Sequence, residues 1–281
     1  MCFVAHHRSA DNSIQTVEEH LLSVSEISSA LTGKIRLKDV GALLGLLHDV
    51  GKYSKSFQEY IKSATGLSNQ DLDSDQAEQL KGKIDHSTAG SQWIWQRFKD
   101  FGPQGELVGQ ILALCLASHH GGLLDCLTPE GEKGFHKRIS KDFDRTHFHE
   151  SFSKANSSVL KKVEALANEK LISDVCKQLA SIIENKPAVV RQFNLGFFTR
   201  FLFSCLIDAD RVDSADFEFP HNKQIRKRDP IDWNIPVQRL EEFLLQLENN
   251  CQIDELRRDI SNQCLRKANN PQGLYTLTVP T

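Results

Sequence analysis

The sequence predicts an all-α fold, and three observations lead to that expectation. Apolar residues recur with helical spacing through most of the 281 residues. Thr16 and Glu19 have the spacing of a capping box, which predicts the start of a helix that runs through Leu31. Leu274 to Val279 is the only stretch with a convincing strand pattern. We therefore expect a helical domain, a short helical extension and one terminal strand.

The composition is that of an ordinary globular protein. Hydrophobic residues make up 40% and charged residues 25% of the chain, and no apolar run approaches the ~20 residues needed to cross a bilayer. Because the first residues lack a signal-peptide pattern, we expect a cytoplasmic protein with no membrane partner. The seven cysteines include no CxxC pair, so nothing indicates a disulfide framework. The net charge of −3 means that nucleic acid would have to bind local basic patches.

The first two predicted helices carry histidines. The capping box opens the first of these helices, on which His20 lies. Asp39 can cap the second, over residues 40–50, which is apolar on most sides. We expect the last turn of the second helix to present His48 and Asp49.

The middle of the chain continues this arrangement. A third helix is expected over residues 86–101, and Gly-Pro at its end predicts a stop. A fourth is expected over residues 106–118. His86 begins the third helix, while His119 and His120 follow the fourth. Histidines are therefore expected at the ends of several helices.

The remaining segments complete the predicted organisation. We expect further helices over residues 156–185, 189–212 and 237–267, with loops or linkers over 66–82, 131–145 and 220–236. The expected domains are residues 1–230 as the main domain, 231–270 as a helical linker and 271–281 as the start of a following domain.

Five histidines and two carboxylates lie at predicted helix ends or on apolar helix faces: His20, His48, Asp49, His86, His119, His120 and Asp210. Imidazole and carboxylate together suit divalent Mn, Fe, Co, Ni or Zn. Seven ligands are too many for one ion, but two ions about 3.5–4 Å apart, bridged by Asp49, would use them all. Asp208 competes with Asp210, because residues two apart on a helix point in different directions. We favour Asp210.

Each of these residues also has an ordinary structural explanation. A lone His-Asp pair is more often structural than metal-binding, and Lys52 could complement a helix C-terminus. Taken jointly, the motifs and their order along the chain favour a single metal-binding site. That site would hydrolyse phosphodiesters with His48, Asp49 and Lys52 as catalytic residues, Lys52 reaching the phosphate as a point charge. Cys115 is expected in the core. The remaining histidines lie in polar surroundings and are expected in solvent: His6, His7, His136, His147, His149 and His221.

The motifs resemble those of the HD nuclease domain of the CRISPR-associated helicase-nuclease of type I systems. They are Glu19-His20-Leu21, residues 47–52 with His48-Asp49 and Gly51-Lys52, Asp85-His86-Ser87, residues 118–123 with His119-His120-Gly121-Gly122, and residues 206–211 with Asp208 and Asp210. The resemblance implies an HD-superfamily domain that cuts single-stranded DNA. It implies His20, His48, Asp49 and Asp210 around one ion, Asp49, His86, His119 and His120 around the other, and Lys52 in support.

The resemblance also implies partners. In the family, the RNA-guided Cascade surveillance complex recruits the enzyme and a C-terminal helicase domain feeds it DNA. Residues 273–281 resemble the strand before the helicase Walker loop, which implies an N-terminal part of a longer protein with no ATP site of its own. DNA contacts are expected at Lys137, Arg138, Arg226 and Arg228, within two basic stretches, although a charge run is usually a solvated surface.

Two other functions fit the same sequence. The metal site could serve a nucleotide phosphohydrolase or phosphodiesterase of the wider HD superfamily. The polar helices after Val237 could instead make the protein a docking module for a surveillance complex. Incubation with a metal ion and either DNA or nucleotides would separate these functions.

Overall fold

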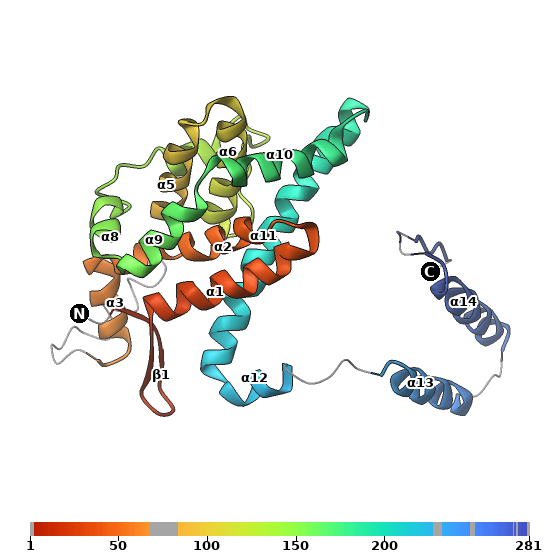
Figure 1. The fold of residues 1–281 in the computed structure, drawn as a ribbon. Helices are drawn as coiled ribbons and strands as arrows, with labels where there is room; N and C mark the ends of the chain where they lie inside the picture. Colours follow the sequence, from red (N-terminus) through yellow and green to blue (C-terminus); the bar gives the residue numbers. More distant parts are fainter. Residues whose placement is uncertain are drawn as a thin grey trace. The chain divides into compact units, whose positions relative to one another are not determined.

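The computed structural model describes residues 3–67, 84–226, 232–247, 251–271, 273 and 275–279. The chain divides into two compact units, Met1–Arg226 and Lys227–Thr281. Helices make up most of the described residues (Figure 1), which confirms the predicted all-α fold. None of the helices in the described ranges has the length and apolar character needed to cross a membrane.

The first unit contains every residue predicted to bind metal. Its elements in chain order are β1 (Val4–Arg8), β2 (Ser13–Thr16), α1 (Val17–Thr32), η1 (Gly33–Ile35), α2 (Lys38–Leu47), η2 (Val50–Tyr53), α3 (Lys55–Ala64), α5 (Thr88–Lys99), α6 (Gly102–Ser118), α7 (Gly134–Ile139), α8 (Phe148–Lys154), α9 (Ser157–Leu166), α10 (Glu169–Ile183), α11 (Ala188–Glu218) and α12 (Pro220–Arg226).

A two-stranded antiparallel sheet precedes the first helix and was not predicted. β1 pairs with β2 so that His6 lies opposite Gln15, with an irregularity between Val4 and His6. Gln58 of α3 holds β1 in place, because its side chain accepts from the backbone N–H of Val4 and donates to the Val4 carbonyl. Strands this short, with several polar residues, give little alternating pattern for sequence analysis to detect.

Helices α1 and α2 pack closely because two glycines of α2 face α1. The predicted capping box of Thr16 and Glu19 is present at the start of α1. A Cβ atom on Gly45 would lie 2.5 Å from the backbone N and Cα atoms of Ser25, so only glycine allows this approach. The close packing brings His20, which is fully buried on α1, toward the end of α2.

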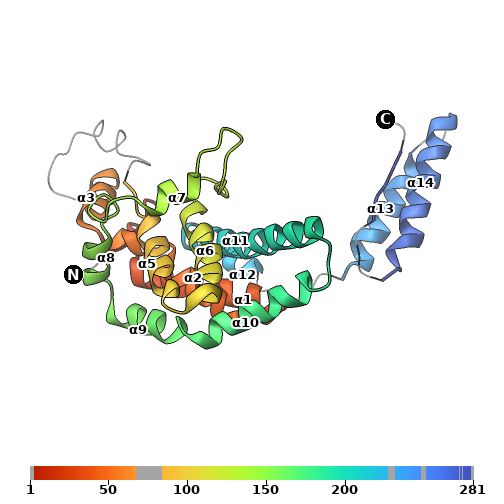
Figure 2. The same ribbon diagram turned by 90° about the horizontal axis from the view of Figure 1, so that it is seen from above.

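Helices α5 and α6 form a second packed pair, and the long helix α11 contacts α1, α2, α6 and α10 (Figure 2). The core between these helices is apolar and fully buried at residues such as Leu47, Ile94, Leu112 and Leu206. Gly102 begins α6, with Pro103 in its first turn, so this Gly-Pro pair opens a helix as well as closing the one before it. The arrangement brings together the ends of α2 and α6, the first turn of α1 and the C-terminal half of α11.

Several predicted boundaries are wrong in detail. The helix predicted over residues 40–50 ends at Leu47, and Asp39 lies in its first turn instead of capping it. The stretch predicted over residues 156–185 is two helices, because the side chain of Asn168 accepts from Leu171 N and starts α10 anew.

The second unit contains helices α13 (Asn234–Gln246) and α14 (Gln252–Ala268). The sequence predicted one helix over residues 237–267, and the predicted linker over 220–236 includes α12 of the first unit. Residues 275–279 form no strand, since no hydrogen bond joins their backbone to another strand in the described part of the chain.

Candidate metal centre

The His48-Asp49 pair lies in the turn between α2 and η2. His48 follows the last residue of α2 and donates its backbone N–H to Leu44 O at 3.0 Å. The backbone of Asp49, with φ of −119° and ψ of 22°, leaves the helical region. Both side chains are buried. An ionised carboxylate in such a place requires charged or hydrogen-bonding partners.

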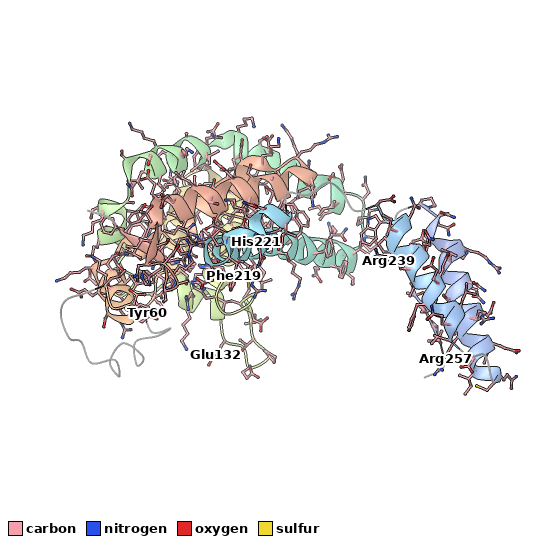
Figure 3. The ribbon with its side chains drawn as sticks, turned by 90° about the horizontal axis from the view of Figure 1, so that it is seen from below. Tyr60, Glu132, Phe219, His221, Arg239 and Arg257 are labelled. Carbon is pink, nitrogen blue, oxygen red and sulfur yellow. The ribbon has the colours of Figure 1, made fainter. Side chains whose placement is uncertain are left out.

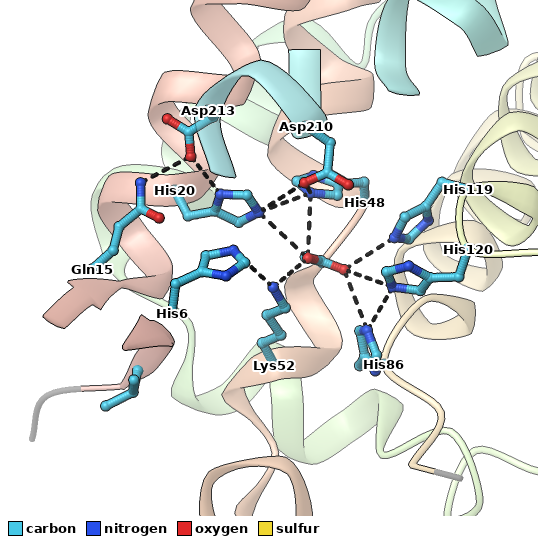
Figure 4. A network of polar contacts seen from close by, with 12 residues as sticks. His6, Gln15, His20, His48, Lys52, His86, His119, His120, Asp210 and Asp213 are labelled. Atoms are coloured by element: carbon cyan, nitrogen blue, oxygen red, sulfur yellow. Dashed lines mark hydrogen bonds and ion pairs between the residues drawn. The ribbon is translucent and has the colours of Figure 1, made fainter. Parts of the chain in front are cut away.

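One group of ligand atoms surrounds the Oδ2 side of Asp49 (Figure 4). Nε2 of His20 lies 3.2 Å from Nε2 of His48, and 3.4 Å from both Asp49 Oδ2 and Asp210 Oδ1. The four side chains offer ligand atoms that all lie within 4.8 Å of one another. Asp210, from α11, faces this group, whereas Asp208 is exposed on another face of the same helix. We call these four residues the inner group.

A second group of ligand atoms surrounds the other oxygen of Asp49. Oδ1 lies 3.1 Å from Nε2 of His119, 3.6 Å from Nε2 of His120 and 3.8 Å from Nε2 of His86. Nε2 of His86 and Nε2 of His120 are 2.6 Å apart. We call these four residues the outer group. The two carboxylate oxygens of Asp49 are thus divided between the inner and outer groups, which is the geometry of a bridging ligand.

Backbone hydrogen bonds fix which ring nitrogen of three histidines faces the cluster. His48, His86 and His119 each point Nδ1 at a carbonyl oxygen two or three residues earlier, at 2.8, 2.9 and 2.7 Å. A carbonyl oxygen can only accept, so Nδ1 carries the proton and Nε2 of the neutral ring presents a lone pair. The lone pairs therefore point at the space between the ligands, as metal coordination requires.

The ring of His20 is oriented by a carboxylate that sequence analysis did not single out. Its Nδ1 lies 2.7 Å from Oδ2 of Asp213, which also accepts from Nε2 of Gln15 at 2.8 Å. Asp213 is buried and lies three residues after Asp210 on α11, a spacing that could have indicated it. Metal-binding histidines usually have such a carboxylate behind them. The nitrogen and oxygen ligands, the ring orientations and this carboxylate all fit divalent metal ions.

The charges of the site also favour a cation. Burial would raise the pKa of Asp49, but the charges of Lys52 and His48 hold it well below its usual range. Burial opposes a charge on His48, yet Asp49 and Asp210 raise the pKa of this imidazole to about 10. Burial by contrast lowers the pKa of His86 to about 4. Protons and metal ions compete for the same histidine nitrogens, so a metal ion can take the place of a proton in the inner group.

Lys52 and His6 lie beside the inner group. Nζ of Lys52 is 2.7 Å from Oδ2 of Asp49 and 3.5 Å from Nε2 of His6. The rings of His6 and His20 meet edge to face at 4.7 Å. The prediction that His6 is solvated is therefore wrong, because β1 turns this side chain inward. Burial, followed by the charge of Lys52, lowers the pKa of His6 to about 2, so its ring is neutral.

The other histidines predicted in solvent differ among themselves. His136, His149 and His221 are exposed, and Figure 3 shows His221 on α12. His147 is half-buried. His7 is also half-buried, and neither ring nitrogen has a hydrogen-bond partner. Cys115 is buried in the core, as predicted.

The residues predicted to contact DNA occupy different surroundings. Lys137 is exposed on α7. Arg138, its neighbour, donates hydrogen bonds within the protein. Arg226 on α12 forms an ion pair with Asp216. Arg228 lies outside the described residues.

Comparison with known proteins adds one match. The family model described as "Cas3, HD domain" matches residues 4–187. That range contains His20, His48 and Asp49 and the whole outer group, and it ends before Asp210. No curated protein matches the chain.

Proposed function

The chain belongs to the family of Cas3 HD domains, and on that basis we propose that it hydrolyses phosphodiester bonds of single-stranded DNA at a centre of two metal ions. Membership of this family makes it a CRISPR-associated, HD-type nuclease and a metal-dependent hydrolase. The observation that carries the two-metal proposal is the division of the Asp49 oxygens between the inner and outer groups.

The inner group would hold one ion and the outer group the other, with Asp49 as a ligand to both. Bound there, divalent ions would lower the pKa of a water molecule and stabilise negative charge on the phosphoryl oxygens. No nucleophilic side chain is then required. The identity of the metal depends on cellular supply as much as on these ligands.

Two residues beside the centre, Lys52 and Asp213, control the charge and the orientation of its ligands. Lys52 keeps Asp49 ionised through their contact at 2.7 Å. The same ammonium group can bind a phosphate oxygen as a point charge when substrate is present. Asp213 fixes the ring of His20, so that the Nε2 lone pair stays available to the ion.

The exposure of the ligands supports one direction of substrate approach. The side chains of His20, His48 and His119 are 0% exposed, whereas His86 is 17% and His120 is 47% exposed. We therefore propose that the scissile phosphate reaches the centre from the side of the outer group. Lys137, exposed on α7, is the best-placed of the predicted basic residues to contact the DNA backbone.

We further propose that this nuclease acts with the partners of its family. These are an RNA-guided Cascade surveillance complex, which would deliver the displaced DNA strand, and a helicase domain in the same protein. The net charge of −3 gives the chain no general attraction for DNA, so delivery by partners would suit it.

The test is to incubate the purified chain with Mn²⁺, Ni²⁺ or Co²⁺ and either circular single-stranded DNA or a panel of nucleotides. We expect linear and shorter DNA products with a metal ion present, none with chelator, and cleavage lower by about 100-fold or more with Asp49→Ala. Intact DNA alongside hydrolysed nucleotides would replace the proposal with a nucleotide phosphohydrolase. Intact DNA and nucleotides in all three metals would favour a docking role.

A further inference from the structure

The backbone that carries His86 lies directly against the turn that carries Asp49. A Cβ atom on Gly51 would lie 2.3 Å from the carbonyl oxygen of His86 and 2.5 Å from its Cα atom. No real side chain tolerates such distances, so the glycine allows the two segments to touch. This contact between the backbones of Gly51 and His86 fixes where the His86 segment lies relative to the turn of Asp49.

Arg138 of α7 holds the same segment at the residues that flank His86. Its Nη2 donates to Ser87 Oγ at 2.7 Å and its Nε donates to Thr88 Oγ1 at 2.8 Å. The same Nη2 lies 3.6 Å from Oδ1 of Asp85. Because a guanidinium is planar and rigid, its contacts hold Asp85, before His86, at a fixed spacing from Ser87 and Thr88, after it.

Asp85 is the second fixed point of this segment. Its carboxylate accepts from the backbone N–H of Thr88 at 3.1 Å and from the Thr88 hydroxyl at 2.8 Å. Nζ of Lys141 donates to its Oδ2 at 2.5 Å. The Asp85 side chain is only 12% exposed, so water screens these contacts less than contacts on an open surface. Asp85 thus connects the start of α5 to α7.

α7 itself cannot move away from this position freely. Phe135 and Ile139, on its apolar face, are buried in the core. Gln92 of α5 donates to the carbonyl oxygens of Ile139 and Lys141 at 3.1 and 2.7 Å. Arg138 therefore projects from an anchored helix, and its Nε and Nη2 donors are engaged by the segment of His86.

We propose that Arg138 and Asp85 are positioning residues that fix His86 in the outer group of the metal centre. Arg138 acts through the segment of His86, and its main role is not to contact DNA. Lys137, one residue earlier and exposed, is left for that contact. The proposal rests on the proposed two-metal centre and assigns the outer ion a dependence on α7 that the inner ion does not share.

The test compares Arg138→Ala with Lys137→Ala, which removes the same charge from the adjacent position of the same helix. Mn²⁺ binding by calorimetry gives the number of ions and the affinity of each. Wild type should bind two ions. Arg138→Ala should bind one of them about 10- to 100-fold more weakly and leave the other unchanged. Lys137→Ala should bind both ions like wild type and lose affinity only for single-stranded DNA.

The possible outcomes separate this proposal from the proposed function. Fewer than two ions on wild type would overturn the two-metal centre itself. Two ions of wild-type affinity on Arg138→Ala, with a DNA-binding loss like that of Lys137→Ala, would make Arg138 a DNA contact and overturn the positioning role. Equal weakening of both ions would indicate general loss of structure and also overturn it.

Two more variants keep the test informative if Arg138→Ala fails to fold. Arg138→Lys keeps the positive charge but lacks the guanidinium that bonds to both Ser87 and Thr88. We therefore expect weaker binding of only one of the two ions. Asp85→Asn keeps an acceptor for the Thr88 N–H while removing the ion pair, and we expect the same selective weakening. Wild-type binding of both ions by these two variants would overturn the proposal.

Discussion

Nδ1 of His20 and Oδ2 of Asp213 lie 2.7 Å apart, and both side chains are buried. The imidazole thus has a carboxylate on one nitrogen and the ligands of the inner group on the other. Asp213 can influence a metal ion only through the ring that it orients. A second donor, Gln15 Nε2 at 2.8 Å, holds the same oxygen in place.

We expect Asp213→Ala to weaken Mn²⁺ binding at the inner group by about 10- to 100-fold, as loss of a carboxylate behind a metal-binding histidine commonly does. The measurement is a calorimetric Mn²⁺ titration. Asp208→Asn is the matched control, because Asp208 is an exposed carboxylate on the same helix. Equal affinities for the Asp213 variant and the control would rule out an orienting role.

Asp49→Ala should abolish binding of both ions and lower DNA cleavage by about 100-fold or more, since metal ions supply several kcal/mol of transition-state stabilisation. Both carboxylate oxygens face histidine nitrogens, and no neighbouring carboxylate lies between the two groups among the described residues. Circular dichroism should show the same helical content as wild type. A variant that keeps one ion at full affinity would contradict the bridging geometry.

The residues predicted as ligands come together in the structure, and each lies in a motif that carries its own signal. His20 lies on a helix with a capping box, and His48, His119 and His120 follow the ends of apolar helices, so local patterns located them. Asp213 was missed because its partner is 193 residues away and the rotation of α11 about its axis is needed to see it. His6 was missed because a five-residue strand gives no clear periodicity.

Sequence patterns do not show features that tertiary packing decides. Arg138 looked like part of a basic patch, but its donors bind Ser87 and Thr88, about 50 residues earlier. The helix before His48 was predicted to continue to residue 50, yet the backbone of Asp49 leaves the helix there. Neither feature has a local signature. Apolar spacing predicted α1, α2, α5, α6 and α11 in the right order. The short helices α3 and α8 were not predicted, and the loop predicted over residues 131–145 is wrong because it contains α7.

Gly51→Ala should destabilise the protein by about 1–3 kcal/mol, the usual cost of forcing extra atoms into a packed site. The added methyl group would meet the backbone of His86, at 2.3 Å from its oxygen. Gly121→Ala is the control, because nothing lies within 4 Å of a Cβ atom at that motif glycine. Urea unfolding measures both variants. Equal stability of the two would show that the contact with His86 can relax.

The ion pair of Asp85 and Lys141 should stabilise the fold at neutral pH and not in acid. Burial would raise the pKa of Asp85, but the Lys141 and Thr88 hydrogen bonds hold it below its usual value. With the folded pKa below the unfolded one, the stabilisation is complete above the unfolded pKa and is lost as pH falls through the folded pKa. Lys141→Met should therefore differ more from wild type at pH 7 than at pH 3.

This pH dependence can be measured by urea unfolding in the presence of a chelator, which removes the effect of metal binding. The quantity of interest is the difference in unfolding free energy between wild type and Lys141→Met at each pH, because other groups titrate alike in both proteins. A difference that stays constant from pH 7 to pH 3 would mean that the pair does not lower the pKa of Asp85.

Mn²⁺ should raise the stability of the folded chain. The ligands come from α1, the turn after α2, the segment before α5, the end of α6 and α11, so only the folded chain brings them together. A ligand that binds only the folded state adds about 2.7 kcal/mol at a free concentration of 100 times its Kd. Urea unfolding with Mn²⁺ and with chelator should show this gain for wild type. Because Asp49→Ala lacks the bridging carboxylate, it should show almost none, and an equal gain in both proteins would place the ion elsewhere.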